Sequence, residues 1–150
     1  MAKSLNQGRF IKGWLASAAY TTTTTSSALS LPTGDCYALC IATSAASGTS
    51  PTLDIVIQSS YDGGSTYVNL PLRFTQVTTT AAEVIYFKQG LGGNEIALAS
   101  LTADTGGQLA KNCVFDPNFM KVKVTVGGST PSITMVMHAA VLPSGRQGEL

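Results

Sequence analysis

Residues 120–141 read MKVKVTVGGSTPSITMVMHAAV, and this stretch decides the fold class. Its first seven residues alternate strictly, with Met or Val at positions 120, 122, 124 and 126 and with Lys or Thr between them. A period of two is typical of a half-buried β-strand. A Gly-Gly-Ser-Thr-Pro-Ser turn signal at 127–132 leads into a second apolar run at 133–141. The pattern predicts a β-hairpin, because Gly and Pro supply the turn between two strands.

The same period recurs upstream of this pair. Tyr37, Leu39 and Ile41 share one face of a predicted strand while small residues take the other, and a further strand is predicted at 83–87. A second hairpin is predicted at 53–70, where the turn 62–65 reads Asp-Gly-Gly-Ser and tolerates positive φ. Short strands with turn signals between them predict an all-β fold, an antiparallel β-sandwich (jelly-roll or Ig-like) of about eight strands.

Residues 1–34 have a different character and predict an extended N-terminal arm. Phe10, Ile11, Trp14 and Leu15 recur at helical spacing, so a short amphipathic helix is one interpretation and an extended segment is the other. Basic residues before a short apolar stretch also imitate a signal peptide or a membrane-surface helix. The apolar part is too short and too diluted by small residues for either.

The predicted sandwich domain covers residues 35–143, followed by a C-terminal tail at 144–150, and 150 residues fit one domain. An insertion at 90–112 lies between Gly-rich stretches and is itself apolar. Long insertions are often functional, so we expect this one to pack on a partner, with an extra strand or a covered helical turn as the alternative. The predicted partner interface consists of Phe10, Ile11, Trp14, Leu15, Tyr20, Leu91, Ile96, Leu98 and Leu101.

The chain is poor in charge. Asp, Glu, Lys and Arg make up 11% of it, against about 25% in an average soluble protein, and the net charge is +1. A near-neutral surface favours association, so the composition predicts a protein that assembles with other subunits as a homo-oligomer, a trimer or dimer. Nucleic acid is not an expected partner because no concentrated basic stretch occurs. A membrane is not expected either, since no apolar run approaches the length that spans a bilayer.

The residues that usually carry catalysis are scarce. His138 is the single histidine, and the strand pattern puts it on the face opposite Met135 and Met137 without an orienting partner. Cys36, Cys40 and Cys113 are an odd set, which predicts buried thiols in a reducing cytoplasm rather than disulfides. The eight carboxylates are scattered, and no cysteine spacing suits zinc. We therefore expect no enzyme activity, no cofactor and no metal site.

Residues 53–70 read LDIVIQSSYDGGSTYVNL, and together with 74–77 they resemble a hairpin found in virion proteins of tailed bacteriophages. The resemblance covers roughly residues 37–87, and Tyr67 stands where Trp is common in those proteins. It implies a small β-sandwich that decorates or cements the capsid surface, made in the cytoplasm of the host bacterium and bound to the major capsid protein. A neck or tail component is implied equally by the hairpin alone. The resemblance brings no catalytic residue.

A second class of function remains open at this point. A carbohydrate-binding, adhesive β-sandwich would use exposed aromatic side chains such as Trp14, Tyr61 and Tyr67. An aromatic content of 7% counts against it.

Overall fold

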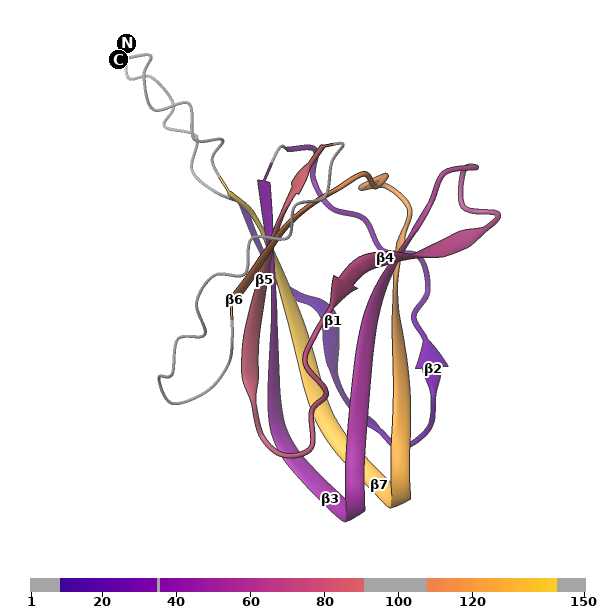
Figure 1. Ribbon diagram of the computed structural model, residues 1–150, viewed down its shortest axis with the longest axis vertical. Coiled ribbons are helices and arrows are strands. Elements are labelled where there is room, and N and C mark those ends of the chain that lie inside the picture. Colours follow the sequence, from indigo (N-terminus) through magenta and orange to yellow (C-terminus); the bar gives the residue numbers. More distant parts are fainter. Residues whose placement is uncertain (1–8, 35, 91–107, 143–150) are drawn as a thin grey trace.

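The computed structural model describes residues 9–34, 36–90 and 108–142 (Figure 1). Within these ranges the protein is all-β, largely antiparallel, and without helix, which confirms the all-β, antiparallel part of the predicted fold class. No helix in the described part of the chain is long and apolar enough to cross a membrane. The strands are β1 (Arg9–Tyr20), β2 (Thr24–Thr25), β3 (Cys36–Ser60), β4 (Tyr67–Arg73), β5 (Ala82–Gln89), β6 (Gln108–Cys113) and β7 (Met120–Leu142).

Two long strands form the backbone of the fold. β3 and β7 pair antiparallel from Cys36 opposite Leu142 to Ser59 opposite Met120. Figure 1 shows the two strands running down side by side, bending together at the bottom and returning. The hairpin predicted within 120–141 is therefore wrong, because residues 120–126 and 133–141 do not pair with each other but with the two halves of β3.

The bend depends on two glycines that approach each other's strand. Gly48 and Gly128 both have φ near +105°, a conformation that residues with a Cβ rarely adopt. A Cβ on Gly48 would lie 2.5 Å from the carbonyl oxygen of Thr130, and one on Gly128 would lie 2.6 Å from that of Ser50. The local sequences, GTSP at 48–51 and GSTP at 128–131, mirror this reciprocal packing.

The remaining strands add to one half of the bent pair or the other. Five strands pair in the order β1-β7-β3-β5-β6, and to this part of the sheet β3 contributes residues 36–46 and β7 contributes residues 133–142. β4 pairs with residues 56–60 of β3, and β2 pairs with residues 123–124 of β7. The β5–β6 pair is parallel, and the other pairs are antiparallel.

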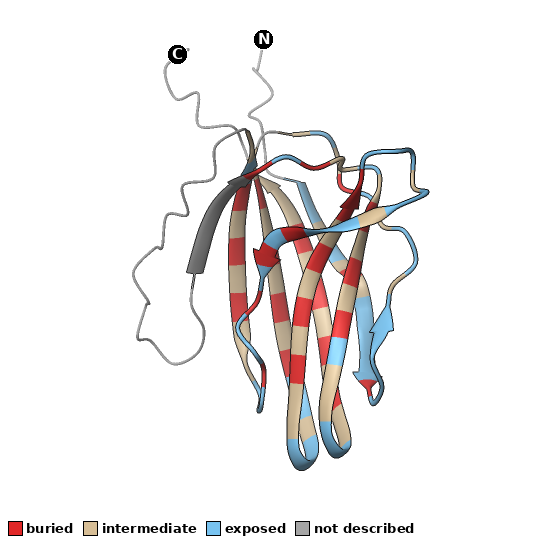
Figure 2. Ribbon diagram, turned by 45° about the vertical axis from the view of Figure 1, so that its right-hand side comes forward, coloured by how far each residue is buried: buried red, intermediate tan, exposed pale blue. Residues whose placement is uncertain are grey.

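One core joins both halves of the bent strands. Buried and partly exposed residues alternate along β3, β5 and β7, as the red and tan bands of Figure 2 show. Burial of apolar side chains at about 25 cal/mol per Å² stabilises this arrangement. The largest fully buried side chains are Tyr37, Phe74, Phe87, Leu39, Ile41, Leu53, Ile55, Ile57, Leu72, Ile85, Met120 and Ile133.

The hairpin predicted at 53–70 is confirmed, with Ser60 opposite Tyr67. Asp62 shapes its turn, since one carboxylate oxygen accepts hydrogen bonds from the backbone N–H groups of Ser65 (3.0 Å) and Thr66 (2.8 Å). The Thr66 backbone bond foremost, and then the hydrogen bond from the Ser60 hydroxyl, lower the pKa of Asp62 to about 2. Local side-chain bonding of this kind is why Asp favours turns.

Two predicted segments take defined positions. Of the two conformations considered for the N-terminal arm, Arg9–Tyr20 adopts the extended one and pairs with β7 of its own chain. In the insertion predicted at 90–112, residues 108–113 form strand β6 beside β5, while 91–107 lie outside the described residues. The tail at 144–150 also lies outside them.

Candidate interaction surface

The outward side chains of β7, β3 and β5, three neighbouring strands of the five-strand part of the sheet, are uncharged and mostly apolar. Because side chains alternate along a strand, the residues between the buried positions point away from the core. They are half-buried by their neighbours in the sheet and, between Cys36–Ala42, Ala82–Tyr86 and Thr134–Leu142, none is Asp, Glu, Lys or Arg. We call this surface the apolar outer face, and define it by Ala38, Cys40, Ala42, Val84, Tyr86, Val136, His138 and Ala140.

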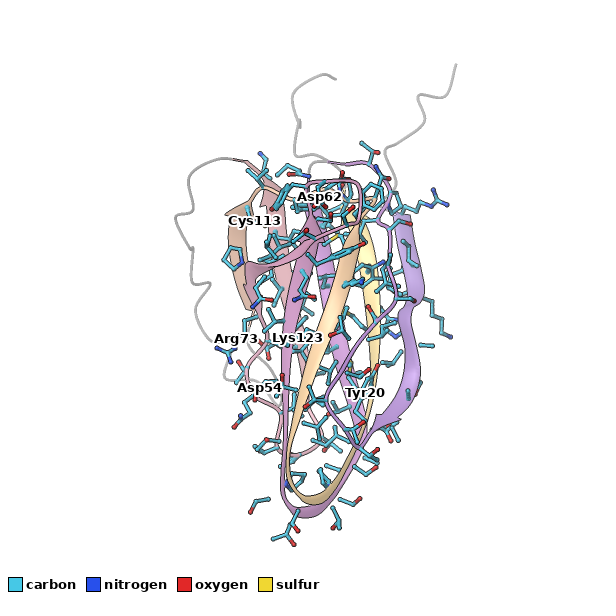
Figure 3. The ribbon with its side chains drawn as sticks, turned by 90° about the vertical axis from the view of Figure 1, so that its right-hand side faces the viewer. Tyr20, Asp54, Asp62, Arg73, Cys113 and Lys123 are labelled. Carbon is cyan, nitrogen blue, oxygen red and sulfur yellow. The ribbon has the colours of Figure 1, made fainter. Side chains whose placement is uncertain are left out.

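The other half of β3 and β7 turns a polar surface outward. We call it the polar outer face, and define it by Asp54, Gln58, Asn69, Arg73, Lys121 and Lys123. Its side chains bind each other. Nη2 of Arg73 lies 3.8 Å from Oδ1 of Asp54, and Nε2 of Gln58 donates a hydrogen bond of 2.8 Å to Oδ1 of Asn69. Figure 3 shows Asp54 and Arg73 together beside β3. The bend thus gives one chain two outer surfaces of opposite character.

The sequence of β3 and β7 carries the same asymmetry. Residues 120–126 alternate between Val and Lys or Thr, as expected for a strand with one face in water. Residues 36–42 (CYALCIA) and 133–142 (ITMVMHAAVL) are apolar at nearly every position instead. Continuous apolar runs are typical of strands covered on both faces. The apolar outer face therefore has the composition of a surface that another molecule covers.

β1 borders the apolar outer face and carries its most exposed apolar side chain. Phe10 is 62% exposed, and its ring centroid lies 5.6 Å from that of His138. The backbone N–H of Gly13 donates a hydrogen bond of 2.7 Å to Nδ1 of His138. Gly13, with φ of +64°, lies where the β1–β7 register shifts. His138 therefore holds a bulge of β1 in place, with its Nδ1 as the acceptor.

The chemistry available on this face is limited. Cys40 lies directly opposite His138 on the neighbouring strand, and burial raises the pKa of the Cys40 thiol, so the thiol stays protonated at neutral pH. On the inward side of β5, the buried carboxylate of Glu83 accepts hydrogen bonds from the backbone N–H (3.0 Å) and hydroxyl of Thr75, which is a structural use. Among the described residues no group of three or more His, Cys, Asp or Glu could hold a metal ion. None of the three cysteines forms a disulfide.

The predicted interface residues on β1 mostly face the core of their own chain. Phe10 is exposed on the apolar outer face, whereas Ile11 and Leu15 are half-buried against the core. Trp14 and Tyr20 are buried, and the indole N–H of Trp14 donates to the carbonyl of Ser30 at 2.9 Å. These four residues attach β1 to its own sheet. The other predicted interface residues lie outside the described ranges: Leu91, Ile96, Leu98 and Leu101.

The aromatic residues considered for glycan binding are already engaged. Trp14 is buried. Tyr61 is 56% exposed, but its hydroxyl donates to the carbonyl of Val114. The ammonium group of Lys121 lies 4.2 Å from the ring centroid of Tyr67 and occupies one ring face. Of these three side chains, Trp14 is buried, Tyr67 has one ring face covered, and Tyr61 keeps an exposed ring.

Sequence reasoning missed most of the apolar outer face. It noted small residues opposite Tyr37, Leu39 and Ile41 but did not connect them with 84–86 and 134–142, because only the sheet order places these segments side by side. The available signal was the lack of charge in two apolar runs. No protein-family model, no curated protein and no solved structure matches this chain.

Proposed function

We propose that this chain is a bacteriophage virion structural protein, a capsid decoration or cement subunit that stabilises the head by bridging major capsid proteins. The observation that carries the proposal is the separation of the two outer faces, one apolar and one polar. A subunit with one apolar face gains stability when that face is covered, and its polar face keeps the covered assembly in contact with water. The hairpin at 53–70, on which the resemblance to phage virion proteins rests, adds support.

The proposal includes a specific form of the fold. We interpret the bent β3–β7 pair as the corner of an antiparallel β-sandwich, in which each half of the two strands belongs to a different layer. Counting β3 and β7 once in each layer turns the seven described strands into nine, one more than the expected eight. The segment before residue 35 would then be an N-terminal arm whose β1 part is attached to its own sandwich.

The mechanism of such a subunit is added buried area. Each Å² of apolar surface covered contributes on the order of 25 cal/mol, less the cost of ordering the interface. Symmetric repetition over the capsid multiplies a modest contact into a large effect on the particle. A chemical step is not required, in keeping with the structural use of Glu83 and His138.

Two other functions receive less support. A neck or tail component would use the same surfaces and differ in symmetry and copy number. An adhesive, carbohydrate-binding sandwich needs accessible aromatic faces, and the burial of Trp14 and the Lys121 ammonium group over one face of Tyr67 weigh against it.

Two measurements test the proposal. Purified protein should bind particles of the encoding phage from which this subunit has been stripped, and should restore their resistance to heat. Quantitative mass spectrometry of intact virions should give hundreds of copies, as expected for a capsid lattice with many equivalent positions. Copy numbers of six or twelve would assign the chain to the neck or tail, and binding to host glycans without binding to particles would refute a capsid role.

A further inference from the structure

We propose that the apolar outer face binds a second copy of this chain, face to face about a two-fold axis. The inference rests on the proposed function in that it takes this face to be a protein-docking surface, and it goes further by naming the occupant. A contact about a two-fold axis is isologous, so the same patch meets itself and each residue near the axis faces its own counterpart.

The distribution of charge favours a second copy over a different protein. Like charges meeting across a two-fold axis cost several kcal/mol, so a self-complementary patch needs a neutral centre. The outward positions of β3, β5 and β7 between 36–42, 82–86 and 134–142 meet this condition. The nearest cations lie at the rim: Lys88 is exposed at the end of the face opposite Cys36, and Arg9 and Lys12 are exposed on the bordering strand β1. A contact with a different protein does not need a neutral centre, because charges of opposite sign on the two partners would stabilise it.

The shape of the face suits sheet-on-sheet packing. Ala38, Cys40, Ala42 and Ala140 are small and lie on neighbouring strands, so two flat sheets can approach to about 10 Å. Tyr86 and Val136 flank this strip on the outward positions of β5 and β7. Side chains of this size leave little conformational entropy to lose on association, since Ala loses none.

The area suits a weak, reversible contact. Three strands, β7, β3 and β5, spaced about 4.8 Å apart make the face about 14 Å wide, and nine residues of β7 (134–142) make it about 30 Å long. Covering it on two subunits removes about 850 Å² from water, below the roughly 1,000 Å² of a stable biological interface and in the range of weak, transient contacts. A reversible dimer of low affinity is the expected result.

The first experiment compares two charge insertions on opposite faces of the full chain. Ala38→Glu puts a carboxylate on the central strand of the apolar outer face, and Thr125→Glu puts one on the outward, exposed side of β7 among Lys121 and Lys123. Analytical ultracentrifugation over a concentration series should show the native chain and Thr125→Glu approaching twice the 15.5 kDa monomer mass. Ala38→Glu should raise the dimer dissociation constant about tenfold or more.

The second experiment needs no change in the face and so does not depend on the folding of Ala38→Glu. Cys40 lies on β3, the middle strand of the five, and should therefore lie near the two-fold axis. Unlabelled and isotopically heavy chains are mixed, treated with a short bis-maleimide and digested for mass spectrometry. Cys40-to-Cys40 links between heavy and light chains are expected. A cysteine introduced at Thr125 of the polar outer face serves as the control and should form no such link with its counterpart.

The outcomes separate this inference from the proposed function. A native chain that is monomeric at every concentration and gives no heavy-to-light link at Cys40 overturns the dimer. If that monomer binds stripped particles and Ala38→Glu abolishes the binding, the face belongs to the capsid protein, so the inference fails while the proposed function stands. A dimer with the expected links that binds no particle confirms the inference and refutes the capsid role.

Discussion

Replacing Gly48 by Ala tests whether β3 and β7 pack as closely at their bend as the structure indicates. The new Cβ would lie 2.5 Å from the carbonyl oxygen of Thr130 and 2.9 Å from Cα of Pro131, so the backbone must move. Gly63→Ala is the matched control, because Gly63 also has a positive φ, +74°, but a Cβ there meets nothing within 4 Å.

The expected magnitudes follow from these two environments. An Ala in a left-handed conformation costs about 1–2 kcal/mol, partly offset by about 0.4–1 kcal/mol because the unfolded chain loses entropy. Gly63→Ala should therefore destabilise the protein by about 1 kcal/mol. Gly48→Ala adds the cost of forcing atoms into a packed site, about 1–3 kcal/mol. Its total of about 2–4 kcal/mol is a large share of the 5–15 kcal/mol typical of a domain.

Urea unfolding followed by circular dichroism measures the difference. With a slope of about 2 kcal/mol per M, Gly48→Ala should unfold about 1 M earlier in urea than Gly63→Ala. Gly128→Ala should behave like Gly48→Ala, since its Cβ would lie 2.6 Å from the carbonyl oxygen of Ser50. Equal midpoints for Gly48→Ala and Gly63→Ala would refute the close approach at the bend.

Three further changes probe β1 and the 53–70 hairpin. Trp14→Ala should lower the free energy of unfolding by about 3–5 kcal/mol in thermal or urea unfolding, because a buried indole leaves a cavity; a loss below 1 kcal/mol would place Trp14 outside the core. His138→Ala removes the acceptor of the Gly13 N–H, so amide hydrogen exchange at Gly13 should accelerate while exchange in the core strands stays slow; unchanged protection would contradict the bond. The folded pKa of Asp62, about 2, lies below the ordinary value of 3.8, so its carboxylate stabilises the fold above pH 3.8 and this contribution is lost as pH falls through about 2. The stability difference between the native chain and Asp62→Asn should therefore shrink in that window, and an NMR titration of Asp62 near its ordinary pKa would refute the assignment.

The hairpin at 53–70 was predictable because its determinants are local. Asp62 and the two glycines after it lie within the turn, and Asp62 bonds to backbone groups three and four residues away. The strand at 120–126 was equally clear from its alternation. The turn signal at 127–132 was misleading, however, because a Gly-Gly-Ser-Thr-Pro sequence suits a hairpin turn and a bend in a longer strand alike.

The helical spacing of Ile11, Trp14 and Leu15, though not of the outward Phe10, has a physical explanation in the strand that they form. The β1–β7 register shifts between Ile11 and Leu15 and again between Leu15 and Ala18. Each bulge inserts extra residues into the strand, so inward positions recur every three or four residues instead of every two. A pattern of local spacing cannot distinguish this bulged strand from an amphipathic helix.

By itself, the sequence determined that the chain forms strands with a period of two, that Gly, Asp and Pro gather where the chain turns or bends, and that charge is scarce, because these properties depend on each residue and its near neighbours. Only the tertiary structure decided that residues 36–60 pair with 120–142, that Gly48 and Gly128 pack across the bend, and that the apolar positions of three strands meet on one outer face. Those outcomes depend on contacts between segments far apart in the chain. Many alternative pairings would satisfy the same local alternation, and packing of one shared core selects among them.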